Sequence, residues 1–165
     1  MNYDKYLEDI EKRLKRNFDL KRDFVHKNMT IDLFAQYLLR NEKYVGSKKI
    51  NIYAFENHEY CLIKHFSTLD IQKIQEYTGY LQSVIDDFVI PHEEHMSSVI
   101  TGVIVADDNC SQEVIDRVKK FKYHKSFAFG FKGWVDIRLV LVLLDKGEVI
   151  TNKKGKEVQK VYQAY

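Results

Sequence analysis

The sequence predicts an α/β protein (mixed α+β) with a single mixed β-sheet, rich in hairpins, and about three helices packed on it. Apolar residues recur at helical spacing in three segments, and elsewhere they alternate or run continuously over strand-length stretches. Helical and strand segments are interleaved along the chain, which favours a sheet covered by helices. The chain has 165 residues with one Pro and seven Gly, so we expect one domain over residues 1–165 with little material for linkers.

The first part of the chain is predicted to form a helix followed by two hairpins. Residues 3–16 place their apolar side chains on one helical face: Tyr3, Tyr6, Leu7, Ile10 and Leu14. Residues 24–64 are rich in strand formers, and we expect tight turns at Lys27-Asn28 and at Asn57-His58.

The second part predicts a helix, a buried strand, a helix and a last hairpin. Ser67 or Thr68 can cap a helix that ends before Pro91, and Asp70 suits its positive N-terminal end. The apolar stripe of this helix is Ile74, Tyr77, Leu81, Ile85 and Phe88. Residues 97–108 are apolar on both faces, as in a central strand covered by helices. Residues 111–121 predict a third helix, capped by Asn109 or Ser111. The predicted order is α-ββ-ββ-α-β-α-ββ, with a turn at 145–147 and a basic tail.

The last hairpin, KSFAFGFKGWVDIRLVLVLL at residues 125–144, carries an unusual face. A two-residue turn at Lys132-Gly133 would place six side chains together: Phe127, Phe129, Phe131, Trp134, Asp136 and Arg138. One interpretation is a partly buried ion pair between Asp136 and Arg138, with Arg138 stacked on Phe127. The other is a platform whose rings stack on a flat ligand while Arg138 and nearby lysines hold an anion.

Charge is unevenly distributed, since residues 70–95 are acidic and residues 117–138 are basic. These patches can neutralise each other within the fold, or they can bind an anionic partner or a second copy of the chain. We expect a non-catalytic binding protein for an anionic partner such as nucleic acid, with a homodimer through the aromatic hairpin as an alternative. The candidate binding residues are Lys122, Lys125, Phe129, Lys132, Trp134 and Arg138.

An enzyme is the remaining alternative. His92 and His95 are three residues apart, so on a helical turn both imidazoles would face the same way, as a metal site requires. A metal-dependent hydrolase or nuclease would use His92, His95 and Asp136 as catalytic residues, with the two histidines as metal ligands. The alternative is that these residues form only a short acidic connection between a helix and a strand, with no metal and no catalytic role. We expect no cofactor.

Two stretches, PHEEHMSSVITGVIVADD and KKFKYHKSFAFGFKGWVDIRLVLV, resemble an uncharacterised family of short bacterial α/β proteins, a domain of unknown function. That resemblance implies a bacterial cytoplasmic protein and no particular activity. The order of elements in the first half also resembles PD-(D/E)XK nucleases. In that resemblance Glu56 stands for the first acid and Lys64 for the lysine, while Leu62 occupies the second acid position. The resemblance therefore implies a degenerate, inactive copy.

The thiols and the N-terminus favour the cytoplasm. Cys61 and Cys110 are expected to be small packing residues in a reducing compartment. The first 16 residues are charged and lack the apolar core of a secretory signal. The longest apolar stretches have the length of strands, so we expect no membrane association.

Overall fold

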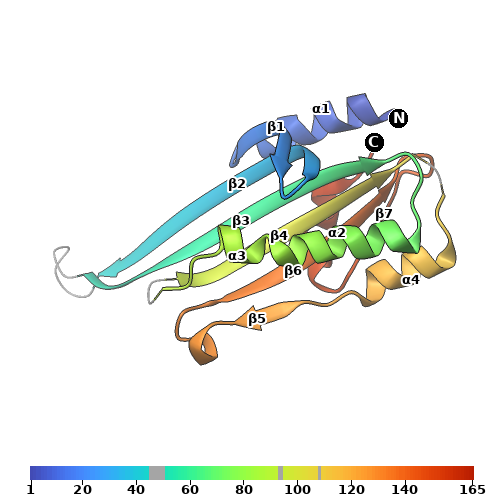
Figure 1. The fold of residues 1–165 in the computed structure, drawn as a ribbon. Coiled ribbons are helices and arrows are strands. Elements are labelled where there is room, and N and C mark those ends of the chain that lie inside the picture. The colour runs from blue at the N-terminus through green and yellow to red at the C-terminus, as the bar shows by residue number, and fades with distance from the viewer. Residues whose placement is uncertain (45–50, 93–94, 108) are drawn as a thin grey trace.

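A computed structural model describes residues 1–44, 51–92, 95–107 and 109–165; of these, the side chains of 38–44, 51–56 and 95–96 lie outside the description. A mixed seven-stranded sheet forms the body of the molecule, with helices on both of its faces (Figure 1). The fold class therefore agrees with the prediction.

The elements follow in a simple order. The N-terminal half contains α1 (Tyr3–Leu14), β1 (Asp19–His26), β2 (Met29–Tyr44), β3 (Asn51–Phe66), α2 (Ile71–Ser83) and α3 (Ile85–Phe88). The C-terminal half contains β4 (His95–Ala106), α4 (Gln112–Lys120), β5 (His124–Ser126), the 3₁₀ turn η1 (Ala128–Gly130), β6 (Trp134–Leu143), β7 (Glu148–Thr151) and the 3₁₀ segment η2 (Lys154–Tyr162).

The sheet combines an antiparallel half with a parallel one. Its order is β1-β2-β3-β4-β6-β5, in which β1, β2 and β3 are antiparallel and β3, β4 and β6 are parallel. One edge of β6 pairs with β4. The other edge pairs with two short strands, β5 along residues 134–136 and β7 along residues 140–143. The stretch of β6 between those two pairings lies next to the candidate site.

Each face of the sheet has its own apolar core. The helices α2, α3 and α4 pack on one face, and α1 with η2 packs on the other. Alternation along β6 sends Val135, Ile137 and Leu139 into the α2 core, so Trp134, Asp136 and Arg138 project from the opposite face. This division of side chains along β6 is the one that the sequence predicts.

Helix caps and the central strand follow local chemistry. The side chains of Asp70 and Ser111 accept hydrogen bonds from the third backbone N–H beyond them. Asp70 therefore caps α2 in place of the expected Ser67 or Thr68, and Ser111 caps α4 as predicted. Residues 98 and 100–106 of β4 are buried, as a parallel strand between two neighbours requires. Gly102 lets this strand approach α2, because a Cβ there would overlap Leu81 Cδ1.

One predicted turn is confirmed and a second is wrong. Lys27 and Asn28 have φ of 50° and 61°, the positive values that a tight hairpin between β1 and β2 demands. Asn57-His58 is not a turn, because β3 runs without interruption from Asn51 to Phe66. From residue 57 onward β3 pairs with β2 on one side and β4 on the other, and this pairing on both edges outweighs the turn preference of the Asn-His pair.

The predicted turn at Lys132-Gly133 is also wrong. Strand β5 ends at Ser126, and residues 127–133 form a loop closed by bonds from Phe127 N to Gly133 O and from Lys132 N to Phe127 O. Ala128, Phe129, Gly130 and Gly133 all have positive φ, which strand residues do not adopt. The register therefore pairs Ser126 with Trp134 and His124 with Asp136.

Two further observations concern the helices and the cysteines. None of the helices in the described ranges is long and apolar enough to span a bilayer. Both cysteines are free thiols; Cys61 is buried and Cys110 is partly buried.

Candidate functional site

Strands β5 and β7 leave a gap along β6, and the side chain of Asn152 fills it. Asn152 Oδ1 accepts hydrogen bonds from the backbone N–H groups of Leu139 and Gly155. Its Nδ2 donates to the carbonyl oxygens of Ile137 and Phe121. One amide side chain thus takes the place of a missing strand and satisfies backbone groups that would otherwise stay unpaired.

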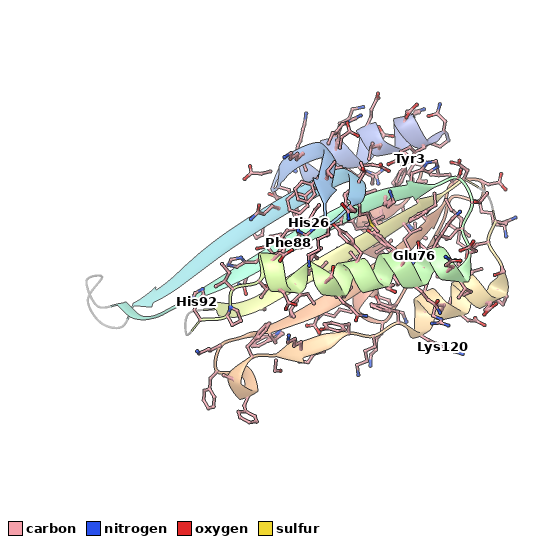
Figure 2. All side chains as sticks on the ribbon, viewed as in Figure 1. Tyr3, His26, Glu76, Phe88, His92 and Lys120 are labelled. Atoms are coloured by element: carbon pink, nitrogen blue, oxygen red, sulfur yellow. The ribbon has the colours of Figure 1, made fainter. Side chains whose placement is uncertain are left out.

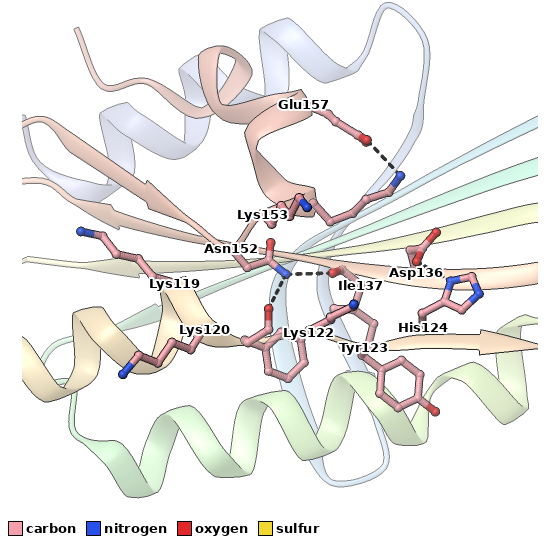
Figure 3. A pocket seen from close by; sticks show the side chains of 12 residues that line it. Lys119, Lys120, Lys122, Tyr123, His124, Asp136, Ile137, Asn152, Lys153 and Glu157 are labelled. Atoms are coloured by element: carbon pink, nitrogen blue, oxygen red, sulfur yellow. Dashed lines mark hydrogen bonds and ion pairs between the residues drawn. The ribbon is translucent and has the colours of Figure 1, made fainter.

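A pocket of about 490 Å³ opens around this gap (Figure 3). Its walls come from the end of α4, the connection to β5, β6 and the start of η2. The lining residues are Lys119, Lys120, Phe121, Lys122, Tyr123, His124, Asp136, Ile137, Asn152, Lys153, Lys154 and Glu157. Five lysines face two carboxylates, so the pocket carries a net positive charge and suits an anion.

The two carboxylates of the pocket already have partners. Asp136 Oδ1 lies 2.7 Å from His124 Nδ1, and Glu157 Oε1 lies 2.9 Å from Lys154 Nζ. Burial alone would raise the pKa of Glu157, but hydrogen bonds from Lys154 and Arg138 outweigh it and lower that pKa from its ordinary value. Glu157 is therefore a carboxylate that binds neighbouring cations, and Lys119, Lys120 and Lys122 remain exposed around the pocket.

Arg138 is bound within the fold. Its guanidinium donates to Glu59 Oε1 at 2.7 Å and to Glu157 Oε2 at 2.8 Å, and its side chain is 13% exposed. Asp136 and Arg138 therefore do not form the ion pair that the sequence suggests. Asp136 pairs with His124, which lies directly across from it, and Arg138 pairs with Glu59 and Glu157. A guanidinium held by two carboxylates has little left to offer an external anion.

The loop at residues 127–133 displays two aromatic side chains in solvent. Phe129 is fully exposed, at 101% relative accessibility, and Phe131 is 83% exposed. Phe127 instead packs against the α2 core, with Lys125 Nζ 5.4 Å from its ring centroid. Exposed large apolar side chains in such a group mark contact surfaces.

The structure thus separates the six predicted binding residues. Lys122 lines the pocket; Phe129 and Lys132 lie on the exposed loop. Lys125 is on β5, and its Nζ lies 4.0 Å from Asp86 Oδ1. Trp134 is the first residue of β6 and is half-buried. Sequence reasoning missed Asn152, Lys153 and Lys154, which the chain brings back to the pocket after β7. Their only signal was the run NKKGK directly after a strand.

The histidine pair remains a prediction. His92 lies at the opposite end of the molecule from Lys120 (Figure 2), away from the lysine pocket, and the side chain of His95 lies outside the described residues. Among the described side chains, no three His, Cys, Asp or Glu residues are placed to hold a metal ion. Of the positions that resemble a nuclease site, the described ones do not form a metal site either. Leu62 is fully buried, and Lys64 Nζ donates to the backbone oxygen of Thr30. The side chain of Glu56 lies outside the description.

A second hollow lies where the parallel strands β3, β4 and β6 end at their carboxyl ends. His65 Nε2 is 2.8 Å from Asp107 Oδ1, and the Tyr3 ring stacks on His65 with centroids 4.2 Å apart. Asp4 and Asp145 also line this hollow. Three carboxylates would repel an anion, so this hollow suits one less well than the lysine pocket does.

Fold and site together define a mixed α/β protein with a basic pocket at the open edge of its sheet. The chain belongs to the family described as domain of unknown function (DUF8052), whose model matches residues 2–164. Comparisons with curated proteins and with solved structures found no match.

Proposed function

We propose that this protein binds single-stranded nucleic acid, with phosphates held at the lysine pocket and bases stacked on the exposed loop. The observation that carries the proposal is the position of Phe129 and Phe131, two exposed rings on the loop that leaves β5 just beyond the pocket residue His124. Proteins that bind single strands combine a basic groove with aromatic platforms in this way.

The dimensions support one continuous contact. Two residues of β5, Lys125 and Ser126, separate the pocket residue His124 from the loop. From His124 to Phe127 the backbone makes three steps of about 3.3 Å, so it spans roughly 10 Å. A strand of a few nucleotides can therefore reach both. Lys122 and Lys132 lie on either side of this span and extend the positive charge between pocket and loop.

The test is fluorescence anisotropy of a labelled single-stranded oligonucleotide, in DNA and RNA versions, over a salt series. We expect binding tighter than about 10⁻⁴ M at low salt and a steep loss of affinity as salt rises. The double variant Lys120→Ala with Lys122→Ala should lower the slope of log K against log salt by about 1.4, because two phosphate contacts are lost. Lys5→Ala is the matched control, since Lys5 is an exposed lysine on α1.

The aromatic half of the contact has a different signature. Phe129→Ala with Phe131→Ala should weaken binding by about 1–3 kcal/mol per stacked base and leave the salt slope unchanged, because stacking involves no counterion. Absence of binding at low salt, or an equal loss in Lys5→Ala, contradicts the proposal. If light scattering finds a dimer that the same phenylalanine variant dissociates, the rings form a homodimer interface instead.

A further inference from the structure

Three polar side chains next to the lysine pocket form a hydrogen-bonded chain. His124 Nδ1 lies 2.7 Å from Asp136 Oδ1, and His124 Nε2 lies 3.2 Å from Ser126 Oγ. His124 and Ser126 are two residues apart on β5, so they project to the same side, and Asp136 faces His124 across the strand pair. We propose that Ser126, His124 and Asp136 form a nucleophilic triad that hydrolyses carboxylic esters.

Donor and acceptor chemistry determines which atom donates in each of these two hydrogen bonds. An ionised carboxylate only accepts, so the proton on His124 lies at Nδ1 and is donated to Asp136. Nε2 of the neutral ring then carries a lone pair, and the Ser126 hydroxyl donates to it. A serine whose hydroxyl proton points at an imidazole base, with the imidazole held by a carboxylate, is the arrangement that activates serine nucleophiles.

The exposure of the three side chains fits the same assignment of roles. The Asp136 side chain is 17% exposed, that of His124 is 47% exposed, and Ser126 is exposed. The carboxylate that orients the ring is thus held in the sheet, while the nucleophile is open to a substrate. A salt bridge that merely tied β5 to β6 would need Asp136 and His124 and would leave Ser126 without a role.

The reaction balances with the groups present. Ser126 Oγ attacks the ester carbonyl carbon while its proton passes to His124 Nε2. The tetrahedral intermediate collapses, the bond to the alcohol oxygen breaks, and the alcohol leaves with that proton. A water molecule then gives a proton to His124 Nε2 and attacks the carbonyl carbon of acyl-Ser126. The bond from that carbon to Ser126 Oγ breaks, Oγ takes the proton back from His124, and the carboxylic acid leaves. No cofactor takes part in either half.

The pocket indicates which esters fit. His124 and Asp136 line the same hollow as the five lysines, so an ester with a negative charge near its acyl group would have its anion held beside the reacting centre. Trp134, the cross-strand partner of Ser126, offers an aromatic surface on the same side. This preference for anionic esters rests on the proposed function, whereas the triad itself does not.

A fluorophosphonate probe tests the triad directly, because it forms a covalent adduct with an activated serine. Intact-mass spectrometry of the full chain should show one adduct on the wild type, at Ser126, and none on Ser126→Ala. Asp136→Asn should label at least about 100-fold more slowly, because the amide can donate to Nδ1 and so favour the wrong tautomer. Ser67→Ala, at an exposed serine outside the site, should label like the wild type. Circular dichroism confirms that each variant is folded.

An unlabelled wild type, or a Ser126→Ala variant that labels like the wild type, overturns the triad. The ester preference is measured with the mono-p-nitrophenyl ester of succinate and the neutral p-nitrophenyl butyrate. The anionic ester should react faster, and Lys120→Ala with Lys122→Ala should remove that advantage. Labelling at Ser126 without any preference upholds the triad and overturns the anionic substrate class. Failure to bind oligonucleotides, with labelling intact, refutes the proposed function and leaves the triad standing.

Discussion

Replacing Asn152 by alanine should destabilise the protein far more than a single side-chain hydrogen bond would suggest. Asn152 is 1% exposed and serves four backbone groups, of which the bonds to Leu139, Ile137 and Gly155 are buried. A buried group left without a partner costs about 1–3 kcal/mol, so three such groups could cost 3–9 kcal/mol. Water entering from the pocket lowers this, and we expect a loss of about 3–5 kcal/mol.

The assay is urea unfolding, followed by far-ultraviolet circular dichroism and by the emission of Trp134, the only tryptophan. The matched control is Asn2→Ala, which removes an asparagine whose side chain accepts one bond, from the exposed Lys5 N–H at the start of α1. Loss of such a cap costs about 0.5–2 kcal/mol. A loss in Asn152→Ala no larger than in Asn2→Ala would refute the reasoning, because the edge of β6 would then be satisfied as well by water as by the amide.

Two further predictions concern packing and thiol chemistry. Gly102→Ala should lower the free energy of unfolding by about 1–3 kcal/mol, because the new methyl overlaps Leu81. Gly79→Ala, on the exposed face of α2, should instead raise it by up to about 1 kcal/mol. Urea unfolding measures both, and equal effects would contradict the close approach of β4 and α2. Burial raises the pKa of Cys61 to about 12 and also raises the pKa of Cys110, but only Cys61 is fully enclosed. At pH 8 a thiol reagent should therefore modify Cys110 and reach Cys61 only on unfolding. Mass spectrometry counts the modified thiols, and equal rates would contradict the burial of Cys61.

The fold could be predicted wherever one local signal dominated. Residues 97–108 are expected to be apolar on both faces, and a central strand with covered faces buries residues 98 and 100–106. Lys27-Asn28 tolerates the positive φ of a tight turn, and Ser111 is a good helix cap. In each case a few adjacent residues determine the outcome, so no knowledge of distant contacts is needed.

The predictions failed where a local pattern suited two structures. Asn57-His58 looks like a turn, but its pairing depends on residues 18 to 20 positions away in β2 and 40 positions away in β4. The alternation of Phe127, Phe129 and Phe131 looks like a strand face, yet positive φ angles at Ala128 and Phe129 place it in a loop. The backbone conformation of such residues is set by the closure of the loop and is not visible in their side-chain pattern.

The pocket was only half predictable for the same reason. Its first three lysines lie in one basic run before β5, and sequence reasoning found the basic character of that region. Lys153 and Lys154 join them only because β7 pairs with the same edge of β6 as β5 does. The run NKKGK after a strand gives no indication of what Asn152 does, since its role depends on the gap between two short strands.

The length of one loop connects the two proposals. With the two-residue turn that the sequence suggests, Phe129 would lie opposite Asp136, and no base would reach that carboxylate. The seven residues at 127–133 move the pairing so that His124 lies opposite Asp136 and Ser126 follows on the same side. The same seven residues turn Phe129 and Phe131 into solvent. One strained loop therefore both sets the register that assembles the triad and displays the rings that would hold a ligand beside it.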